Sequence, residues 1–326
     1  MKRLDFIDLS KVIGIYLVIY GHYIWYMGIP PQNDSLVCYI DRFVTLFHMP
    51  LFFIISGFLF KQDKCINIKK VKKVLSRLIL PYVLIHVICL GLGILIFNRE
   101  ISLFIQFKSI MCGGDPISNL YSAPLWFCFS LAFIHLAFSL LNKYHYILIP
   151  VGLYMLFQKD IYPFRIDSSL VGFLFFEVGF LLKKYIVKIP DLDVKVRGTI
   201  LCISLFVLLL TSLHFRISNN LIFSINSMQF GIYPLVFLLS GISGTCFVFF
   251  LSSFIKIKSI SIHIINISNG AIIFLGFQKI IYFYLRDIVV TDNLIASILI
   301  SLVVFIVCYA IAILSKRYFP ILQGMR

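Results

Sequence analysis

Charged side chains are scarce in this chain of 326 residues: Asp, Glu, Lys and Arg make up 13% of it, whereas hydrophobic residues make up 60%. No soluble fold of this length needs so large an apolar fraction. Runs such as 199–213 and 294–314 hold no charged residue, which indicates helices that cross a membrane. Neither end is long or polar enough for a separate soluble domain. We therefore predict a single, all-α polytopic membrane domain over residues 1–326.

The sequence also lacks the patterns that indicate metal binding or disulfide formation. Its eight cysteines include no Cys-x-x-Cys pair and mostly lie in apolar runs, so we interpret them as small apolar side chains. The basic N-terminus resembles that of a signal peptide, but no small-x-small cleavage site follows it, and we expect a retained first span. An inverted repeat, which many transporters show, is not visible either. Because no spacing of Cys or His suggests a metal site, we expect no metal, and we also expect no permanently bound cofactor.

Acidic residues are few as well: 14 Asp and Glu stand against 29 Lys and Arg, which gives a net charge of +15. The basic residues form short clusters between the apolar runs, so nucleic acid is not expected as a partner. We expect about ten transmembrane helices, at approximately 9–27, 37–60, 78–97, 125–141, 146–157, 169–182, 198–213, 232–254, 271–285 and 294–314. With a cytoplasmic N-terminus, 21 of the basic residues fall on the cytoplasmic side and eight outside or within a span. This asymmetry favours both termini in the cytoplasm.

Two ionisable residues, Lys11 and His22, are joined by ten mostly apolar ones. On an α-helix, eleven steps of about 100° bring both side chains to one face, about 16 Å apart along the axis. An ionisable residue so deep in an apolar span is a candidate functional residue, and neutral imidazole is suited to accept a proton. His22 is thus a candidate general base, or else a histidine hydrogen-bonded against a neighbouring helix. Lys11 either marks the cytoplasmic end of the span or binds an anionic group at the mouth of the same cavity.

A second histidine, His48, lies in the next apolar run, and Pro50 follows it two residues later. Proline frees a backbone carbonyl and kinks a helix, whereas Ser56 and the glycine after it permit close contact between helices. His48 and Ser56 are therefore candidates either for binding or for packing. Asp41 and Arg42 begin this span on the outer side and either face a polar substrate or pair with each other.

Four further polar or aromatic residues lie at or within the expected spans. Arg77 ends a basic stretch, where its planar guanidinium suits phosphate, although attraction to lipid headgroups explains most of the neighbouring lysines. Trp126 opens the fourth span and is either an interfacial anchor or a binding residue. Glu177 lies inside the sixth span, where a carboxylate must face the bundle interior. Lys279, near an outer span end, is expected to extend toward the membrane surface.

Taken together, these stretches resemble membrane acyltransferase family 3, and among its members the sugar O-acetyltransferases of the fucose 4-O-acetylase type. The basic residue, ten residues and histidine of 11–22, followed by FHMPLFFIISGFLF at 47–60, resemble the first two spans of that group. RLILPY at 77–82 and LWF at 125–127 resemble later motifs of the family. The chain departs from the pattern in one place, because Gln278 stands near the position where many relatives end the ninth span on a histidine.

The resemblance implies an enzyme, a membrane O-acyltransferase that moves an acetyl or other acyl group from acyl-CoA to a hydroxyl of a cell-envelope polysaccharide or its lipid-linked sugar precursor. It implies that His22 is the catalytic histidine, that Lys11 is a basic partner in donor binding, and that Arg77 helps to hold the phosphates of CoA. The expected location is the bacterial cytoplasmic (inner) membrane, with acyl-CoA, the glycan acceptor and lipids as partners. The other candidate binding residues are His48, Ser56, Trp126, Asp41, Arg42 and Glu177.

Two other functions fit parts of the sequence. A transporter or flippase of a lipid-linked sugar would also be polytopic and basic inside, with polar groups in its spans. The absence of a visible repeat and the clustering of polar residues near one end of the chain argue against it. A structural subunit of an envelope complex would have no need of the intramembrane residues His22 and His48.

Overall fold

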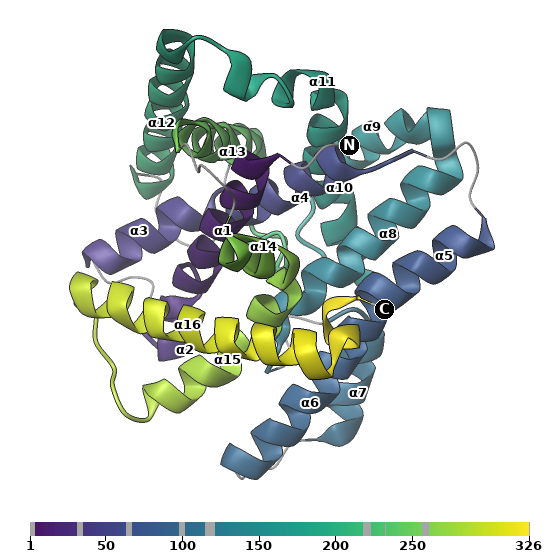
Figure 1. Ribbon diagram of the computed structural model, residues 1–326, viewed down its shortest axis with the longest axis vertical. Coiled ribbons are helices and arrows are strands. Elements are labelled where there is room, and N and C mark those ends of the chain that lie inside the picture. Colours follow the sequence, from purple (N-terminus) through teal and green to yellow (C-terminus); the bar gives the residue numbers. More distant parts are fainter. Residues whose placement is uncertain are drawn as a thin grey trace.

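A computed structural model gives the fold and describes residues 4–30, 35–62, 67–97, 102–114, 121–217, 223–231, 233–255 and 261–325. Figure 1 shows the helices gathered around α1 (Asp5–Tyr20) and α4 (His48–Leu59). Large apolar side chains remain exposed on the outside, and Leu95, Leu140 and Ile295 are each more than two-thirds exposed. Such a surface is suited to lipid rather than to water.

Seven helical stretches in the described part are long and apolar enough to cross a membrane, and a bent helix pair makes an eighth if it counts as one span. The chain is therefore a polytopic, helical membrane protein, as the sequence predicts. The first four stretches comprise α1 with α2 (Tyr23–Met27); α3 (Leu36–Thr45) with α4; α5 (Ile68–Val74), the π-helical turn η1 (Leu75–Ile79) and α6 (Leu80–Phe97); and η3 (Ala123–Leu125), α8 (Trp126–Leu141), η4 (Asn142–Ile147) and α9 (Leu148–Met155). The others are α12 (Val194–Ile217), α13 (Pro234–Phe254), α16 (Leu294–Tyr318) and the pair of α14 (Ile262–Asn269) and α15 (Ala271–Arg286), bent by 74°.

The predicted number of about ten transmembrane helices is not confirmed. The fifth expected span corresponds to α9, which has only eight residues, and the sixth to α10 (Ile166–Leu181), which has 16 residues. At about 1.5 Å per residue α10 is about 24 Å long, which is less than the hydrocarbon core of about 30 Å. Hydropathy identified α10 as apolar, but the helix is a buried core element, because 12 of its 16 residues are buried.

Close backbone contact joins α10 to α4. A β-carbon on Gly57 would overlap the backbone carbonyl of Phe176, and one on Gly179 would overlap the carbonyl of Ile54. Glycine at both positions therefore lets the two helices approach as near as their backbones allow. Ser56, beside this contact, is partly exposed.

The first two spans are both interrupted where their histidines lie. α1 ends at Tyr20 and α2 begins at Tyr23, so the helix expected to be continuous through His22 is broken just before it. α3 ends at Thr45, and Pro50 is the third residue of α4. Proline has no N–H to donate and its ring clashes with the carbonyl four residues earlier, so α3 cannot continue through this point; near a helix start the missing donor costs nothing.

The bent pair lies beside α1 and runs in the same direction. Near the start of both, the Ser268 hydroxyl donates a hydrogen bond to Asp8 Oδ1 at 2.5 Å. Further along, the Tyr282 hydroxyl donates to the carbonyl oxygen of Ile19 at 3.0 Å. These bonds place the residues of α15 next to the interruption of the first span.

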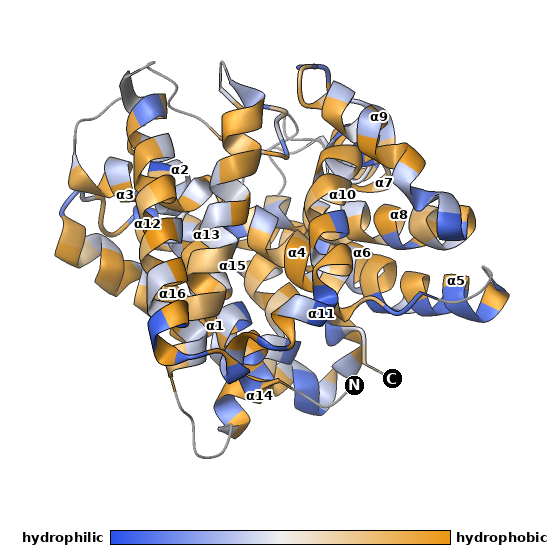
Figure 2. Cartoon of the chain, turned by 90° about the horizontal axis from the view of Figure 1, so that it is seen from above, coloured by the Kyte–Doolittle hydropathy of each residue, from blue (hydrophilic) through white to orange (hydrophobic). Residues whose placement is uncertain are grey.

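The polar helix ends gather toward one edge of the molecule. In Figure 2 the short basic helix α11 (Lys183–Ile186), α14, α5 and both marked chain ends lie toward the lower edge, where blue residues are frequent. The smaller elements of the described part are α7 (Leu103–Met111), η5 (Pro163–Arg165), η6 (Ile189–Asp191) and η7 (Pro320–Gln323).

Candidate functional site

Two histidines lie side by side at the interruptions of the first two spans. The rings of His22 and His48 are 5.9 Å apart between centroids and nearly perpendicular. Each Nδ1 atom lies close to a carbonyl oxygen one turn earlier, at 2.7 Å from Val18 for His22 and at 3.1 Å from Val44 for His48. A carbonyl only accepts hydrogen bonds, so in the neutral rings Nδ1 carries the proton. The lone pair is then on Nε2, which is the atom that can accept a proton from a bound molecule.

Both histidines line a cavity of about 420 Å³, a volume typical of sites for small molecules. Trp126, at the start of α8, forms part of its wall. Another part is the segment 223–229, which is closed on itself by two backbone hydrogen bonds between Ser224 and Gln229, at 2.8 and 3.0 Å. The cavity thus combines the first two spans with α8 and with the connection between α12 and α13.

Two residues of α15 that the sequence did not single out as site residues, Lys279 and Gln278, complete this region. Lys279 lines the cavity, is 3% exposed, and holds its ammonium 5.5 Å from the ring centroid of Tyr26 and 5.3 Å from that of Phe283. These are cation–π contacts inside the protein, so Lys279 does not extend to the membrane surface as expected. A charge inside an apolar run was the signal that could have identified it.

Gln278 is completely buried and lies near His22. Neither of its amide atoms has a geometrically acceptable hydrogen bond within the described part of the chain. A buried amide without such a bond costs free energy unless a bound molecule supplies a partner. The departure of this position from the family pattern was the available signal in the sequence.

The electrostatic character of this cavity follows from its lining. It contains the Lys279 ammonium and two imidazoles, and none of the described lining residues is Asp or Glu. His22 and His48 do not belong to any group of three or more His, Cys, Asp or Glu residues suited to a metal, as far as the described chain extends. The arrangement can remove a proton at a histidine Nε2 and stabilise negative charge that develops on an oxygen atom.

A second cavity, of about 800 Å³, lies at the opposite end of α4. Its lining includes Phe60, His135 and five cationic residues, and no described carboxylate. Arg77 lies in the π-helical turn η1, and such turns occur frequently at functional sites. His48 and Leu59, at the two ends of α4, are about 16 Å apart at 1.5 Å per residue, and this distance separates the two cavities along the helix. The five cationic residues are Lys61, Lys69, Lys70, Lys73 and Arg77.

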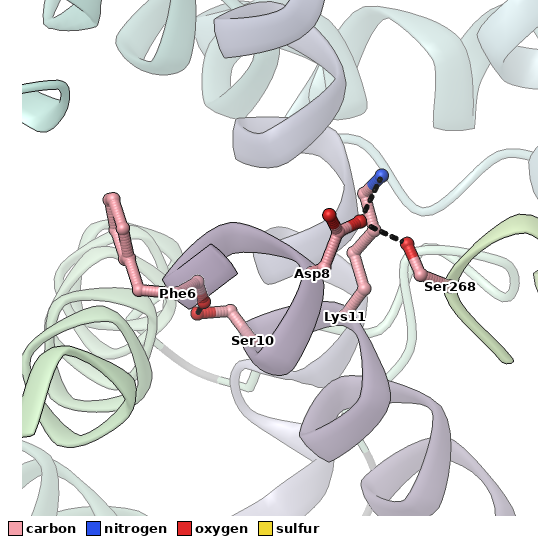
Figure 3. Close-up of polar contacts among 5 residues, drawn as sticks. All are labelled: Phe6, Asp8, Ser10, Lys11 and Ser268. Carbon is pink, nitrogen blue, oxygen red and sulfur yellow. Dashed lines mark hydrogen bonds and ion pairs between the residues drawn. The ribbon is translucent and has the colours of Figure 1, made fainter. Parts of the chain in front are cut away.

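Lys11 does not line either of these cavities. Its ammonium is 3.8 Å from Asp8 Oδ1, which also accepts the hydrogen bond from Ser268. Figure 3 shows Asp8 placed between these two partners. Because Ser268 precedes the bend into α15, this cluster fixes that helix, which carries Gln278 and Lys279, against α1.

Three other predicted residues lie elsewhere. The Oε2 atom of Glu177 lies 3.1 Å from Nδ1 of His145. Glu177 therefore pairs with His145, and not with His22, and this pair joins η4 to α10. Asp41 is buried, at 2% exposure, and does not line either cavity. Arg42 lines a separate groove between α3 and α12. The structure thus brings together His22, His48 and Trp126 in the first cavity, which we call the histidine cavity. It places Arg77 in the second cavity, which we call the basic cavity.

Comparison with known proteins identifies the family. The chain matches the family model described as an acyltransferase domain, of acyltransferase family 3, over residues 4–315. No curated protein and no solved structure matches the chain significantly. The matched region contains both cavities and extends over nearly the whole sequence. The chain therefore belongs to acyltransferase family 3, and it is a membrane acyltransferase.

Proposed function

We propose that this acyltransferase moves an acetyl or similar acyl group from acyl-CoA to a hydroxyl of a cell-envelope polysaccharide or its lipid-linked sugar precursor, in the bacterial cytoplasmic membrane. The observation that carries the proposal is the histidine pair, in which each Nδ1 lies within hydrogen-bonding distance of a backbone carbonyl, so that Nε2 is the atom that can act as a base. Transfer to a hydroxyl needs such a base, because the hydroxyl must lose its proton as it attacks.

In the proposed reaction the acceptor oxygen attacks the thioester carbonyl carbon while its proton passes to Nε2 of His22. The carbonyl oxygen gains negative charge, which the Lys279 ammonium stabilises in a cavity without carboxylates. The carbon–sulfur bond then breaks, and the departing thiolate receives the proton from His22. His48 and Gln278 hold the acceptor hydroxyl, since both present polar atoms beside His22.

The basic cavity is suited to the phosphates of CoA, because five cationic residues and no described carboxylate line it. α8 connects the two cavities as α4 does: Trp126 lines the first and His135 the second. Between them Phe53 packs on Phe127, with ring centroids 4.8 Å apart. We propose that the acyl end of the donor reaches the histidines by displacing these rings.

Mass spectrometry of surface glycan tests the proposal in cells that lack the gene and carry either the wild-type chain or His22→Ala. We expect glycan that is lighter by one acyl group in the variant, with the protein inserted at normal abundance. Normal acylation in the variant would remove His22 from the reaction. Loss of all surface glycan, rather than of the acyl group, would support a flippase instead.

A further inference from the structure

The described part of the connection between α12 and α13 forms a polar wall of the histidine cavity. Every residue from Phe223 to Gln229 except Met228 lines this cavity, and none of them lines the basic cavity. We call this stretch the 223–229 turn. It carries no charged side chain, so its side chains bind a molecule through neutral hydrogen bonds and apolar contact. Its polar residues that line the cavity are Ser224, Asn226, Ser227 and Gln229.

Asn226 lies in the middle of the turn. Its side chain is partly exposed, and its Oδ1 atom has no hydrogen-bond partner within the described part of the chain. By contrast, the Ser224 hydroxyl accepts a hydrogen bond from the backbone N–H of Ser227 at 3.2 Å, so it helps to close the turn. Rotation of the Asn226 amide by 180° about its terminal bond presents either its oxygen or its NH₂ group. This amide is therefore suited to meet a hydroxyl, which both donates and accepts hydrogen bonds.

Arg165, which is 1% exposed, holds the turn in place. Its guanidinium donates hydrogen bonds to the backbone carbonyl of Asn226 and to the Ser168 hydroxyl. The Ser168 hydroxyl in turn donates to the carbonyl of Ile225 at 2.9 Å. The guanidinium carbon also lies 5.8 Å from the ring centroid of Trp126. Arg165 thus fixes two walls of the histidine cavity relative to each other, and walls fixed in advance lose little entropy when a molecule binds.

The proposed donor leaves the hydrogen-bonding groups of the turn unused. Its phosphates occupy the basic cavity, and an acetyl group that enters the histidine cavity has a single carbonyl oxygen, which Lys279 stabilises. A sugar ring carries several hydroxyls besides the one that reacts, and its C–H faces pack on indole rings. Trp25 and Trp126 both line the cavity. The turn and the two indoles together therefore fit an uncharged sugar ring.

We infer that the 223–229 turn is the acceptor-recognition element of the enzyme. Asn226 and Ser227 bind hydroxyls of an uncharged sugar ring, and the reacting hydroxyl of that ring then lies at His22. The inference rests on the proposed function and deepens it, because it assigns the residues that determine which sugar and which hydroxyl are acylated. Arg165 is a positioning residue, since it bonds to the backbone of the turn and does not line the cavity.

Binding of the glycan in the absence of any donor tests this inference. The probe is surface glycan isolated from cells that lack the gene, and its Kd for the detergent-purified protein is measured by microscale thermophoresis. Asn226→Ala should raise this Kd by about two- to tenfold, which is the net value of one hydrogen bond. The Kd for acetyl-CoA should stay unchanged, because no residue of the turn lines the basic cavity. Ser227→Ala should have the same effects and provides a second variant if Asn226→Ala does not fold.

Asn269→Ala is the matched control. Asn269 is exposed and lines neither the two cavities nor the groove between α3 and α12, so both Kd values should equal those of the wild type. An unchanged Kd for the glycan in both turn variants would overturn the inference, as would a wild-type protein that does not bind the glycan. Equal weakening of glycan and acetyl-CoA binding would also overturn it, because the turn would then only support the fold. The measurement involves no acyl transfer, so its failure is distinct from that of the His22→Ala experiment.

Discussion

Replacement of His22 by asparagine tests the proposed base without removing its structural hydrogen bond. The asparagine amide can donate to the Val18 carbonyl, which is 2.7 Å from Nδ1 in the native chain, but it has no basic atom that takes up a proton near neutral pH. General base catalysis contributes about 100- to 10,000-fold to a rate, which corresponds to about 2.7–5.5 kcal/mol of transition-state stabilisation. We therefore expect kcat to fall within that range.

The assay follows release of the CoA thiol from acetyl-CoA by the purified enzyme with its glycan acceptor. His263→Asn is the control, because His263 is exposed, contacts Tyr309 and does not line any of the three cavities. A His22→Asn enzyme that keeps kcat within tenfold of the wild type would refute the assignment of the base. If His48→Asn alone loses the rate, the two histidines exchange roles, since their Nδ1 atoms are held in the same way.

Three further substitutions address the cation, the donor site and the packing. Lys279→Met should lower kcat by about 100-fold, because the oxyanion loses its cation, and initial rates with saturating substrates measure this; an unchanged kcat would exclude the role. Arg77→Gln should raise KM for acetyl-CoA by about tenfold with little change in kcat, since a charged hydrogen bond to phosphate is lost; rates over a range of donor concentrations check it. Gly57→Ala should destabilise the fold by about 1–3 kcal/mol through overlap with Phe176, whereas Gly91→Ala, with open space around its added methyl, should not lower the thermal unfolding midpoint, because alanine favours a helix more than glycine does.

Local sequence features predicted much of the helical architecture. Hydropathy located seven of the expected spans, and an eighth if the bent pair is one span, because apolar side chains must cover a helix that faces lipid wherever it lies in the bundle. It could not separate α10 from the spans, since an interior helix of a membrane protein is as apolar as one in lipid. Helix length, and not composition, distinguishes the two cases.

The histidine cavity shows a different limit. His22 and His48 were identifiable individually as polar residues in apolar runs, but their proximity depends on two helix interruptions that no periodicity reveals. The sequence predicts that Lys279 extends to the membrane surface, whereas in the structure it contacts the rings of Tyr26 and Phe283. Tyr26 is remote in the sequence, and tertiary packing decides which face of α15 is enclosed, so the sequence alone does not reveal these contacts. Lys11 shares the helix of the first span with its partner Asp8, yet its contact with α14 through Ser268 is equally invisible in the sequence.

The separation of the two cavities has a physical reason in the proposed reaction. The phosphates of CoA carry charges that are too costly to bring to the middle of a membrane, so they must stay in the basic cavity at the end of α4. Only the acyl end can travel the distance of about 16 Å along that helix. The packed rings of Phe53 and Phe127 would meanwhile keep water from the thioester until an acceptor is bound. On this basis the packed rings of Phe53 and Phe127, and not the histidines, protect the donor from hydrolysis. The histidines then act only on a hydroxyl that is already held in their cavity.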